Sequence, residues 1–308
     1  MIRIAILTPN PAVDVTYRVA QQRIGVTQRV QDVQRMPGGK GLNVARVLAA
    51  LDVPSLSLLP LGGATGAWIA QRLGALGLDA RVVPVAGETR QTVTVVDEAT
   101  HPTMFGEPGP EVGAAEWAAV GAAVEAAAAE ASVLVVSGSL PPGADPQRVG
   151  EWVASAARRG VPSIVDVSGP ALLAAAAAGA SVLKPNLEEL LDATGAGTEG
   201  AACDALLDLG AGAVVVSRGA DGIALHTREA SMTLPAVAGV RGNPTGAGDA
   251  AVAGLAFALA TGLGLAEGLR HATALGAAAV LRPVAGEIDP AAYCRFLDEL
   301  PEPHQERT

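Results

Sequence analysis

Short, continuous apolar runs alternate with longer helical patterns over most of the chain. The apolar runs predict buried parallel strands, which need apolar residues on both faces, at Ile2–Leu7, Ser55–Leu61, Ser132–Ser137, Pro162–Val167, Ser181–Leu183 and Ala213–Ser217. The 3.6-residue patterns predict helices near Leu42–Leu51, Ala67–Leu76, Ala114–Ala131, Pro146–Arg159, Ala171–Ala178, Leu187–Ala193, Ala250–Ala266, Ala266–Val280 and Pro290–Leu300. This alternation predicts an α/β fold with right-handed crossovers and a layered, mostly parallel sheet.

Two stretches follow a period of two instead. They lie at approximately residues 13–36 and 90–105, and they include the alternating segments Val13–Val19 and Gln91–Val96. Such alternation is typical of half-exposed strands, so we expect a small sheet that projects from the main body as a lid. No Pro-, Gly- or Ser-rich linker divides the chain, and residues 1–308 are therefore expected to form a single domain.

Composition narrows the class of protein. The 308 residues are 50% hydrophobic and 17% charged, which fits a large core and argues against disorder. A net charge of −10 argues against a broad nucleic-acid surface. Cys203 and Cys294 lack metal-ligand spacing, and the first residues resemble a strand rather than a signal peptide, so we expect a cytoplasmic protein. Ala250–Ala266 is rich in alanine and glycine and stands alone, which favours a buried helix over a membrane span.

The run Asn243–Asp249 is the strongest chemical signal in the chain. It places a carboxylate after a turn of small residues, at the start of a long apolar helix pattern. Backbone N–H groups at a helix start attract an anion, and glycines let a ligand approach them closely. An acid beside such a turn would repel phosphate, but it suits a base that removes a proton from a hydroxyl. The run therefore predicts phosphoryl transfer to an alcohol.

The chain has only two lysines, Lys40 and Lys184, and both lie in loop motifs next to Gly or Pro. Gly38–Asn43 opens a predicted helix, and could be either a flexible connection or a site for hydroxyls and phosphate. Lys184–Glu189 follows a predicted strand. Asn186 and Glu189 have capping-box spacing, and the same two side chains could orient hydrated Mg²⁺ near nucleotide phosphates.

Other glycine-rich segments leave alternatives open. Gly195–Gly200 matches the G-x-G-x-x-G pattern of dinucleotide-binding oxidoreductases, but it follows a predicted helix, which favours a helix-to-helix turn. A P-loop is absent, because Lys40 is followed by Gly41. Ser217–Gly222 could be a hairpin turn or a platform for a nucleotide. Asp14, Arg90 and Ser139 are candidate substrate contacts.

Taken together, Pro37–Asn43 and Asn243–Asp249 resemble the diagnostic motifs of the PfkB carbohydrate kinase family. The resemblance extends over almost the whole chain and is greatest to the hexose-phosphate branch of 1-phosphofructokinase, tagatose-6-phosphate kinase and the minor 6-phosphofructokinase. It implies a ribokinase-like three-layer αβα sandwich with a mostly parallel sheet and a small β-sheet lid.

The resemblance also implies site roles. Asp249 would be the catalytic base, and the N–H groups of Gly246, Ala247 and Gly248 would form an anion hole. The residues implied for the sugar phosphate are Asp14, Gly38, Gly39, Lys40, Asn43, Arg90 and Ser139, with Lys40 and Arg90 on its phosphate. Those implied for ATP are Lys184, Asn186, Ser217, Gly219, Gly222 and Thr245, with Glu189 near hydrated Mg²⁺. A monovalent cation such as K⁺ is typical of the family.

The expected function is ATP-dependent phosphorylation of a hexose phosphate, either of the 1-phosphofructokinase type, which gives fructose 1,6-bisphosphate, or of the tagatose-6-phosphate kinase type. The alternatives are a kinase for an unphosphorylated sugar or nucleoside and a non-catalytic sugar-phosphate sensor. We expect small-molecule partners, the sugar phosphate and ATP, with no nucleic acid and no membrane. An exposed lid sheet also suggests a homodimer that forms through the lid.

Overall fold

The core of the molecule is a large sheet whose central strands are parallel. The computed structural model describes residues 3–97 and 102–307. The parallel strands are β1 (Ile4–Leu7), β4 (Ser55–Leu61), β5 (Ala80–Pro84), β8 (Val133–Ser137), β9 (Ser163–Asp166), β10 (Val182–Leu183) and β11 (Val214–Ser217). The antiparallel strands β12 (Ile223–His226), β13 (Ala230–Leu234) and β14 (His304–Arg307) extend one edge, so the order is β14-β13-β12-β11-β10-β9-β8-β1-β4-β5.

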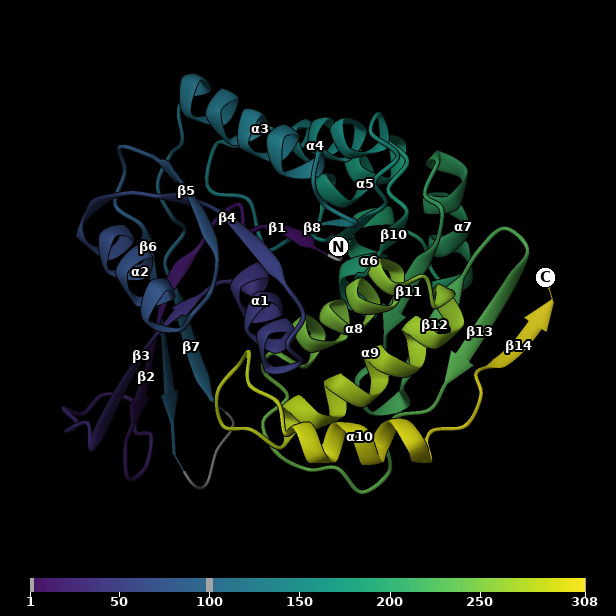
Figure 1. Ribbon diagram of the computed structural model, residues 1–308. Helices are drawn as coiled ribbons and strands as arrows, with labels where there is room; N and C mark the ends of the chain where they lie inside the picture. The colour runs from purple at the N-terminus through teal and green to yellow at the C-terminus, as the bar shows by residue number, and fades with distance from the viewer. Residues whose placement is uncertain (1–2, 98–101, 308) are drawn as a thin grey trace.

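Helices cover both faces of this sheet (Figure 1). One layer consists of α3 (Ala114–Ala128), α4 (Gln147–Ala157), α5 (Pro170–Ala177), α6 (Leu187–Thr194) and α7 (Glu199–Leu209), and the other of α1 (Lys40–Ala50), α8 (Ala247–Thr261), α9 (Gly264–Val280) and α10 (Pro290–Glu299). The strands supply both cores by alternation. On β1, Ile4 and Ile6 belong to the α8–α9 core, whereas Ala5 and Leu7 belong to the α3–α4 core. The predicted three-layer α/β sandwich is thus confirmed.

A second, small sheet projects from one end of the molecule (Figure 1). Its strands are β3 (Asp32–Gly38), β2 (Ala12–Arg18), β6 (Arg90–Val96) and β7 (Thr103–Gly106), in the order β3-β2-β6-β7. Val13 and Val15 of β2 are buried against Ile69 and Leu73 of α2 (Gly63–Ala75). The two alternating segments therefore do form a sheet of their own, although residues 98–101 of the predicted segment lie outside the described residues.

The segment Gly195–Gly200 forms a helix-to-helix turn, as predicted. Gly195 ends α6 in the left-handed conformation, with φ of 68°, and Thr198 caps α7 by accepting a hydrogen bond from the Ala201 N–H. A dinucleotide-binding loop needs a strand directly before its glycines, and here helix α6 precedes them. The segment therefore does not have the structure of a dinucleotide-binding loop.

Helix α8 lies deep in the molecule and packs closely on α9. Gly254 makes this possible, because a Cβ at this position would lie 2.6 Å from the Ala272 nitrogen. Most of α8 is buried up to Ala258, which confirms a core helix over the first part of the predicted Ala250–Ala266 segment. The prediction was too long at its end: α8 stops at Thr261 because Gly262 takes the left-handed conformation, and residues 262–264 are exposed. Among the described residues, no helix combines the length and apolar character needed to cross a membrane.

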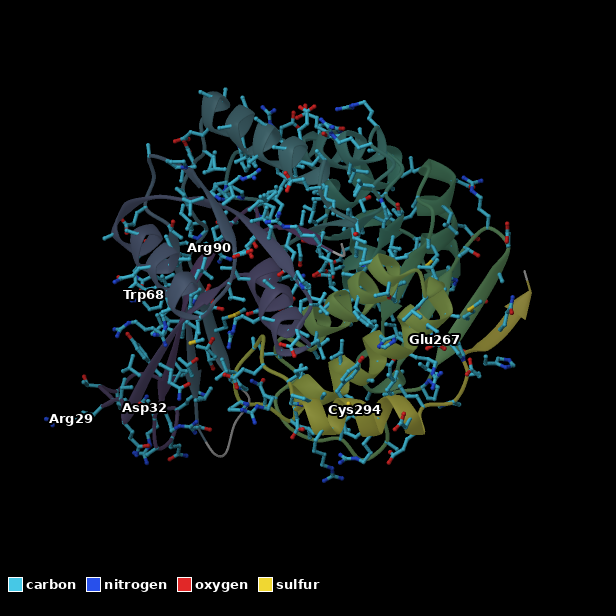
Figure 2. The ribbon with its side chains drawn as sticks, viewed as in Figure 1. Arg29, Asp32, Trp68, Arg90, Glu267 and Cys294 are labelled. Carbon is cyan, nitrogen blue, oxygen red and sulfur yellow. The ribbon has the colours of Figure 1, made fainter. Side chains whose placement is uncertain are left out.

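The tryptophans are divided between the two parts of the molecule. Trp117 on α3 and Trp152 on α4 are buried, with ring centroids 5.8 Å apart. Trp68 on α2 is partly buried against the apolar cluster beneath the small sheet (Figure 2).

Candidate active site

Polar side chains gather where neighbouring parallel strands end. Ser137 ends β8, Asp166 ends β9, Lys184 follows β10 and Ser217 ends β11. Because these strands are adjacent and parallel, their carboxyl ends lie along one edge of the sheet. Ligands of open α/β sheets bind at this edge.

Asp249 reaches this edge from α8. Gly246 is the N-cap of that helix, with φ of 85°, and the helix begins at Ala247, so Asp249 is in its first turn. The carboxylate is 7% exposed, and its Oδ2 accepts a hydrogen bond of 2.8 Å from Asn43 Nδ2 on α1. The two motifs that the sequence singled out, 206 positions apart, therefore meet at one hydrogen bond.

The surroundings of Asp249 suit a base that works near neutral pH. Burial and, to a lesser extent, the neighbouring Asp166 raise the pKa of Asp249 to about 7, even though the Asn43 hydrogen bond, Lys40 and Lys184 act in the opposite direction. A carboxyl group with this pKa is a stronger proton acceptor than an ordinary aspartate, yet it is still ionised at slightly alkaline pH.

Asp166 is a central residue of the site that the sequence analysis missed. Its side chain is 2% exposed and accepts a hydrogen bond from Ser137 Oγ at 3.1 Å. Its Oδ1 lies 3.3 Å from Lys40 Nζ and 3.9 Å from Lys184 Nζ. Burial opposes ionisation, but the two ammonium groups and the serine together keep the pKa of Asp166 below its ordinary value. One signal was present in the sequence: this acid interrupts the apolar run from Ile164 to Val167.

Lys40 lies between two carboxylates. Its Nζ is 3.3 Å from Asp166 Oδ1 and 3.5 Å from Glu189 Oε1. Burial would lower the pKa of Lys40, but Asp166, Glu189 and Asp249 raise it overall, so the ammonium stays charged. The contacts of Lys40 are thus with carboxylates on the side of the site expected to meet ATP and Mg²⁺. Its role on the substrate's phosphate stays a prediction.

Lys184, Asn186 and Glu189 form a compact group at the start of α6. Asn186 Oδ1 accepts from the Glu189 N–H at 2.8 Å, and Glu189 Oε2 accepts from the Asn186 N–H at 2.9 Å. This is the capping box that the spacing predicted. Lys184 Nζ lies 3.5 Å from Ser217 Oγ, which ties the group to the end of β11.

Asp14 and Arg90 lie at the base of the small sheet. Burial raises the pKa of Asp14 to about 6, and Arg90, the Gly39 N–H and Arg46 oppose this rise. Gly38 leaves room for the Asp14 carboxylate, because a Cβ there would lie 2.1 Å from Asp14 Oδ2 and would displace that side chain. Arg90 Nε donates to Asn10 O at 3.1 Å, and its Nη1 donates to Glu107 O at 3.2 Å (Figure 2).

The remaining predicted residues are either exposed or are glycines that the backbone conformation requires. Ser139, Thr245 and Gly219 are exposed. Gly222 has φ of 91°, and a Cβ there would lie 2.2 Å from Leu234 O, so its glycine is required by the close approach of another strand. Gly39 similarly has φ of 102° and is the N-cap of α1.

Arg218 points away from the strand edge. Its guanidinium binds both carboxylate oxygens of Glu199 on α7, and His226 Nε2 lies 2.8 Å from Glu199 Oε1. These contacts anchor the loop between β11 and β12 to α7.

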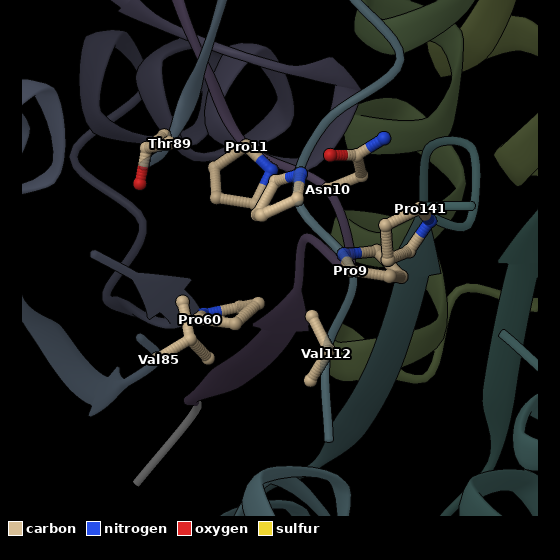
Figure 3. Close-up of a pocket in the computed structure, with 9 residues that line it drawn as sticks. Pro9, Asn10, Pro11, Pro60, Val85, Thr89, Val112 and Pro141 are labelled. Atoms are coloured by element: carbon tan, nitrogen blue, oxygen red, sulfur yellow. The ribbon is translucent and has the colours of Figure 1, made fainter. Parts of the chain in front are cut away.

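A small pocket surrounds the segment Pro9–Pro11, which precedes β2 (Figure 3). Its walls are mainly prolines and valines, contributed by Pro9, Asn10, Pro11, Pro60, Val85, Thr89, Pro110, Val112 and Pro141. It contains none of the predicted catalytic residues. The predicted catalytic residues lie instead at the edge of the sheet, where Asp249, Asp166 and the two lysines come together.

The fold and this site define a kinase of the carbohydrate type. The model of the pfkB family of carbohydrate kinases matches residues 8–292. The chain therefore belongs to this family, and its fold is ribokinase-like, as the sequence predicted.

Individual relatives are phosphofructokinases. The chain is 36% identical to the ATP-dependent 6-phosphofructokinase isozyme 2 of Mycobacterium tuberculosis, over 98% of this chain and 91% of the relative. Phosphofructokinase-2 from Escherichia coli, solved in complex with potassium, is 30% identical with a TM-score of 0.90, covering 97% of this chain and 99% of that one. A possible 1-phosphofructokinase from Thermotoga maritima is 25% identical with a TM-score of 0.87, covering 99% of both chains.

Proposed function

We propose that this protein transfers the γ-phosphoryl group of ATP to a hydroxyl of a hexose phosphate, with Asp249 as the base. The observation that carries this proposal is the convergence of Asp249, Asn43 and the glycine turn at the strand edge, opposite Lys40 and Lys184. The names of the relatives support the hexose-phosphate class.

In the proposed mechanism, Asp249 accepts the proton of the attacking sugar hydroxyl. Asn43 orients the carboxylate through its 2.8 Å hydrogen bond. The N–H groups of Gly246, Ala247 and Gly248 at the start of α8 are the proposed donors that stabilise the charge developing on the transferred group. In this structure the Ala247 N–H donates to Pro244 O at 3.1 Å, so it would have to exchange that acceptor for the phosphoryl oxygen. Asp14 orients the sugar as a hydrogen-bond acceptor.

On the nucleotide side, Lys184, Asn186, Ser217, Gly219, Gly222 and Thr245 are the proposed contacts of ATP. Asp166 and Glu189 offer the carboxylate oxygens that Mg²⁺ prefers, and we propose that Glu189 holds hydrated Mg²⁺ beside the phosphates. Both carboxylates also lie within 3.5 Å of the Lys40 ammonium, which supports a site that attracts cations. Mg²⁺ would hold and neutralise the phosphates when bound. We also propose K⁺ as an activating ion, since the E. coli relative was solved with potassium.

Fructose 6-phosphate is the acceptor that we propose first, because the M. tuberculosis relative carries that activity in its name. Fructose 1-phosphate is the second candidate, favoured by the relative from T. maritima. An ADP-release assay over fructose 6-phosphate, fructose 1-phosphate, tagatose 6-phosphate, plain sugars and nucleosides separates them. Turnover of plain sugars alone would contradict the proposal, and binding without turnover would indicate a sensor.

Replacing the base tests the mechanism. We expect Asp249→Asn to lower kcat by roughly 10²- to 10⁴-fold with little change in ATP affinity, because the amide cannot accept the proton. The measurement is steady-state kinetics together with ATP binding by calorimetry. Near-normal turnover would remove Asp249 from the proposed role.

Arg90 is the proposed contact of the substrate's own phosphate. We expect Arg90→Ala to raise the KM of the sugar phosphate by roughly 10- to 100-fold, since a charge-assisted hydrogen bond is lost. Arg72→Ala, an exposed change on α2, is the matched control. Equal KM values for the two variants would place the phosphate elsewhere.

We further propose that the protein acts in the cytoplasm, where ATP and sugar phosphates are both present, and that two copies pair through their small sheets. Apolar side chains exposed on this part of the chain support such pairing: Ile24, Val26, Val30, Val33, Met104 and Phe105.

A further inference from the structure

Arg46 lies one turn after Asn43 on α1 and binds a distant loop. Its side chain is only 10% exposed. Nη1 donates to Ala285 O at 2.8 Å, and Nη2 lies 3.5 Å from Glu287 Oε1. The guanidinium therefore fastens the segment of residues 283–287, called here the 283–287 loop, to the helix that carries Asn43.

The 283–287 loop packs directly against Gly246 of the proposed anion hole. A Cβ added to Gly246 would lie 2.9 Å from the Cα of Ala285. On the other side, a Cβ added to Gly286 would lie 2.9 Å from Asn43 Oδ1. Asn243 Nδ2 also donates to Pro283 O at 3.1 Å. With so little space on either side, the loop sets the separation between α1 and the turn that begins α8.

The charge of Arg46 also acts on the proposed sugar-binding acid. The groups that favour the ionised form of Asp14 against its burial are Arg90 from β6, the Gly39 N–H and Arg46 from α1. Arg46 thus interacts with both the 283–287 loop and Asp14.

We propose that Arg46 is a positioning residue of phosphoryl transfer. Its fork of N–H donors keeps the anion-hole N–H groups in register with Asn43 and Asp249, and its charge helps to keep Asp14 ionised for the sugar. The inference rests on the proposed roles of Asp249, Asp14 and Gly246–Gly248. Lysine cannot replace the first action, because an ammonium has no planar fork, but it can replace the second.

Three variants separate the two actions. We expect Arg46→Lys to lower kcat by roughly 10- to 100-fold, the scale of a small misplacement of reacting groups, with the KM of the sugar phosphate near wild type. Arg46→Met should lower kcat similarly and also raise that KM, most strongly at acidic pH, because the loss of the cation raises the pKa of Asp14. The control is Arg282→Met, which removes another arginine of Glu287, 3.3 Å from Oε2 and 44% exposed, and should leave both constants unchanged.

Hydrogen exchange gives a readout that does not depend on activity. Peptides covering residues 281–287 and 243–248 should exchange faster in both Arg46 variants than in wild type or Arg282→Met. Full kcat in Arg46→Lys, or kinetics and exchange of Arg46→Met that match Arg282→Met, would overturn the inference. A wild-type protein that transfers no phosphoryl group would instead refute the proposed function, and exchange would still decide whether Arg46 holds the loop.

Discussion

At the scale of single residues, the site brings two buried carboxylates and two lysine ammonium groups close together. Asp249 and Asp166 repel each other, and two lysines offset the repulsion. The sequence revealed Asp249 and Lys40 because glycine turns flank them. It did not reveal Asp166 or Arg46, because one lies within a strand and the other within a helix, where nothing local distinguishes a functional side chain from a structural one.

The raised pKa of Asp249 predicts a change in stability. An acid whose folded pKa lies above its unfolded value favours folding while protonated, so that contribution is lost as pH rises through about 7. Asp249→Asn should therefore raise the Tm at pH 8 by several degrees, with a smaller gain toward pH 5. Thermal unfolding at both pH values is the measurement, with the exposed Asp192→Asn as control. A gain that is equal at both pH values would contradict the burial argument.

The same pKa predicts the pH profile of catalysis. The base must be ionised to act, so kcat/KM for the sugar phosphate should fall below pH 7, by about tenfold per unit. Asp14, with its pKa raised to about 6, should steepen the fall at lower pH. Steady-state kinetics across this range check the profile. A rate that stays flat down to pH 5 would show that neither carboxylate titrates in the reaction.

At the scale of elements, the apolar pattern predicted the central strands and most helices, because buried parallel strands and long helices carry strong signals. It gave no range for α7, which only the predicted helix-to-helix turn implied, and it missed the strands β5, β13 and β14. Strand β5 has mostly exposed residues, and strands at a sheet edge need fewer apolar residues than central ones. The helix-to-helix turn at Gly195–Gly200 was predicted because its flanking context, rather than its letters, was weighed.

Because α8 and α9 pack closely at Gly254, adding a single methyl group there should destabilise the fold. Gly254→Ala should lower the free energy of unfolding by roughly 1–3 kcal/mol, because the added Cβ meets the backbone of His271 and Ala272. Gly121→Ala on α3 is the matched control, since nothing lies within 4 Å of its added Cβ, and it should stabilise by about 0.5–1 kcal/mol. Chemical denaturation measures both. A neutral Gly254→Ala would mean that the two helices separate easily.

At the scale of the whole molecule, the sequence predicted the family and the kind of fold, and the comparisons confirm both. How the small sheet packs on the rest of the molecule is harder to predict from a sequence. The docking of the small sheet depends on contacts such as Val13 with Ile69, which join segments far apart in the chain.

Exposed apolar side chains predict how two molecules associate. If the small sheets pair, Ile24→Asp should convert a dimer into a monomer, because it places a charge in the apolar contact. Leu209→Asp, at an exposed position on α7 away from the small sheet, is the control and should leave the assembly unchanged. Light scattering after size-exclusion chromatography measures the mass. A wild-type protein that is monomeric at micromolar concentration would refute the pairing.

The position of Trp68 has a practical consequence. Its indole packs beneath the small sheet, whereas Trp117 and Trp152 lie together in the core between α3 and α4. In a Trp117→Phe, Trp152→Phe background, intrinsic fluorescence would come from Trp68 alone. Stopped-flow emission could then follow, without any added dye, how quickly the small sheet moves when a sugar phosphate or ATP enters.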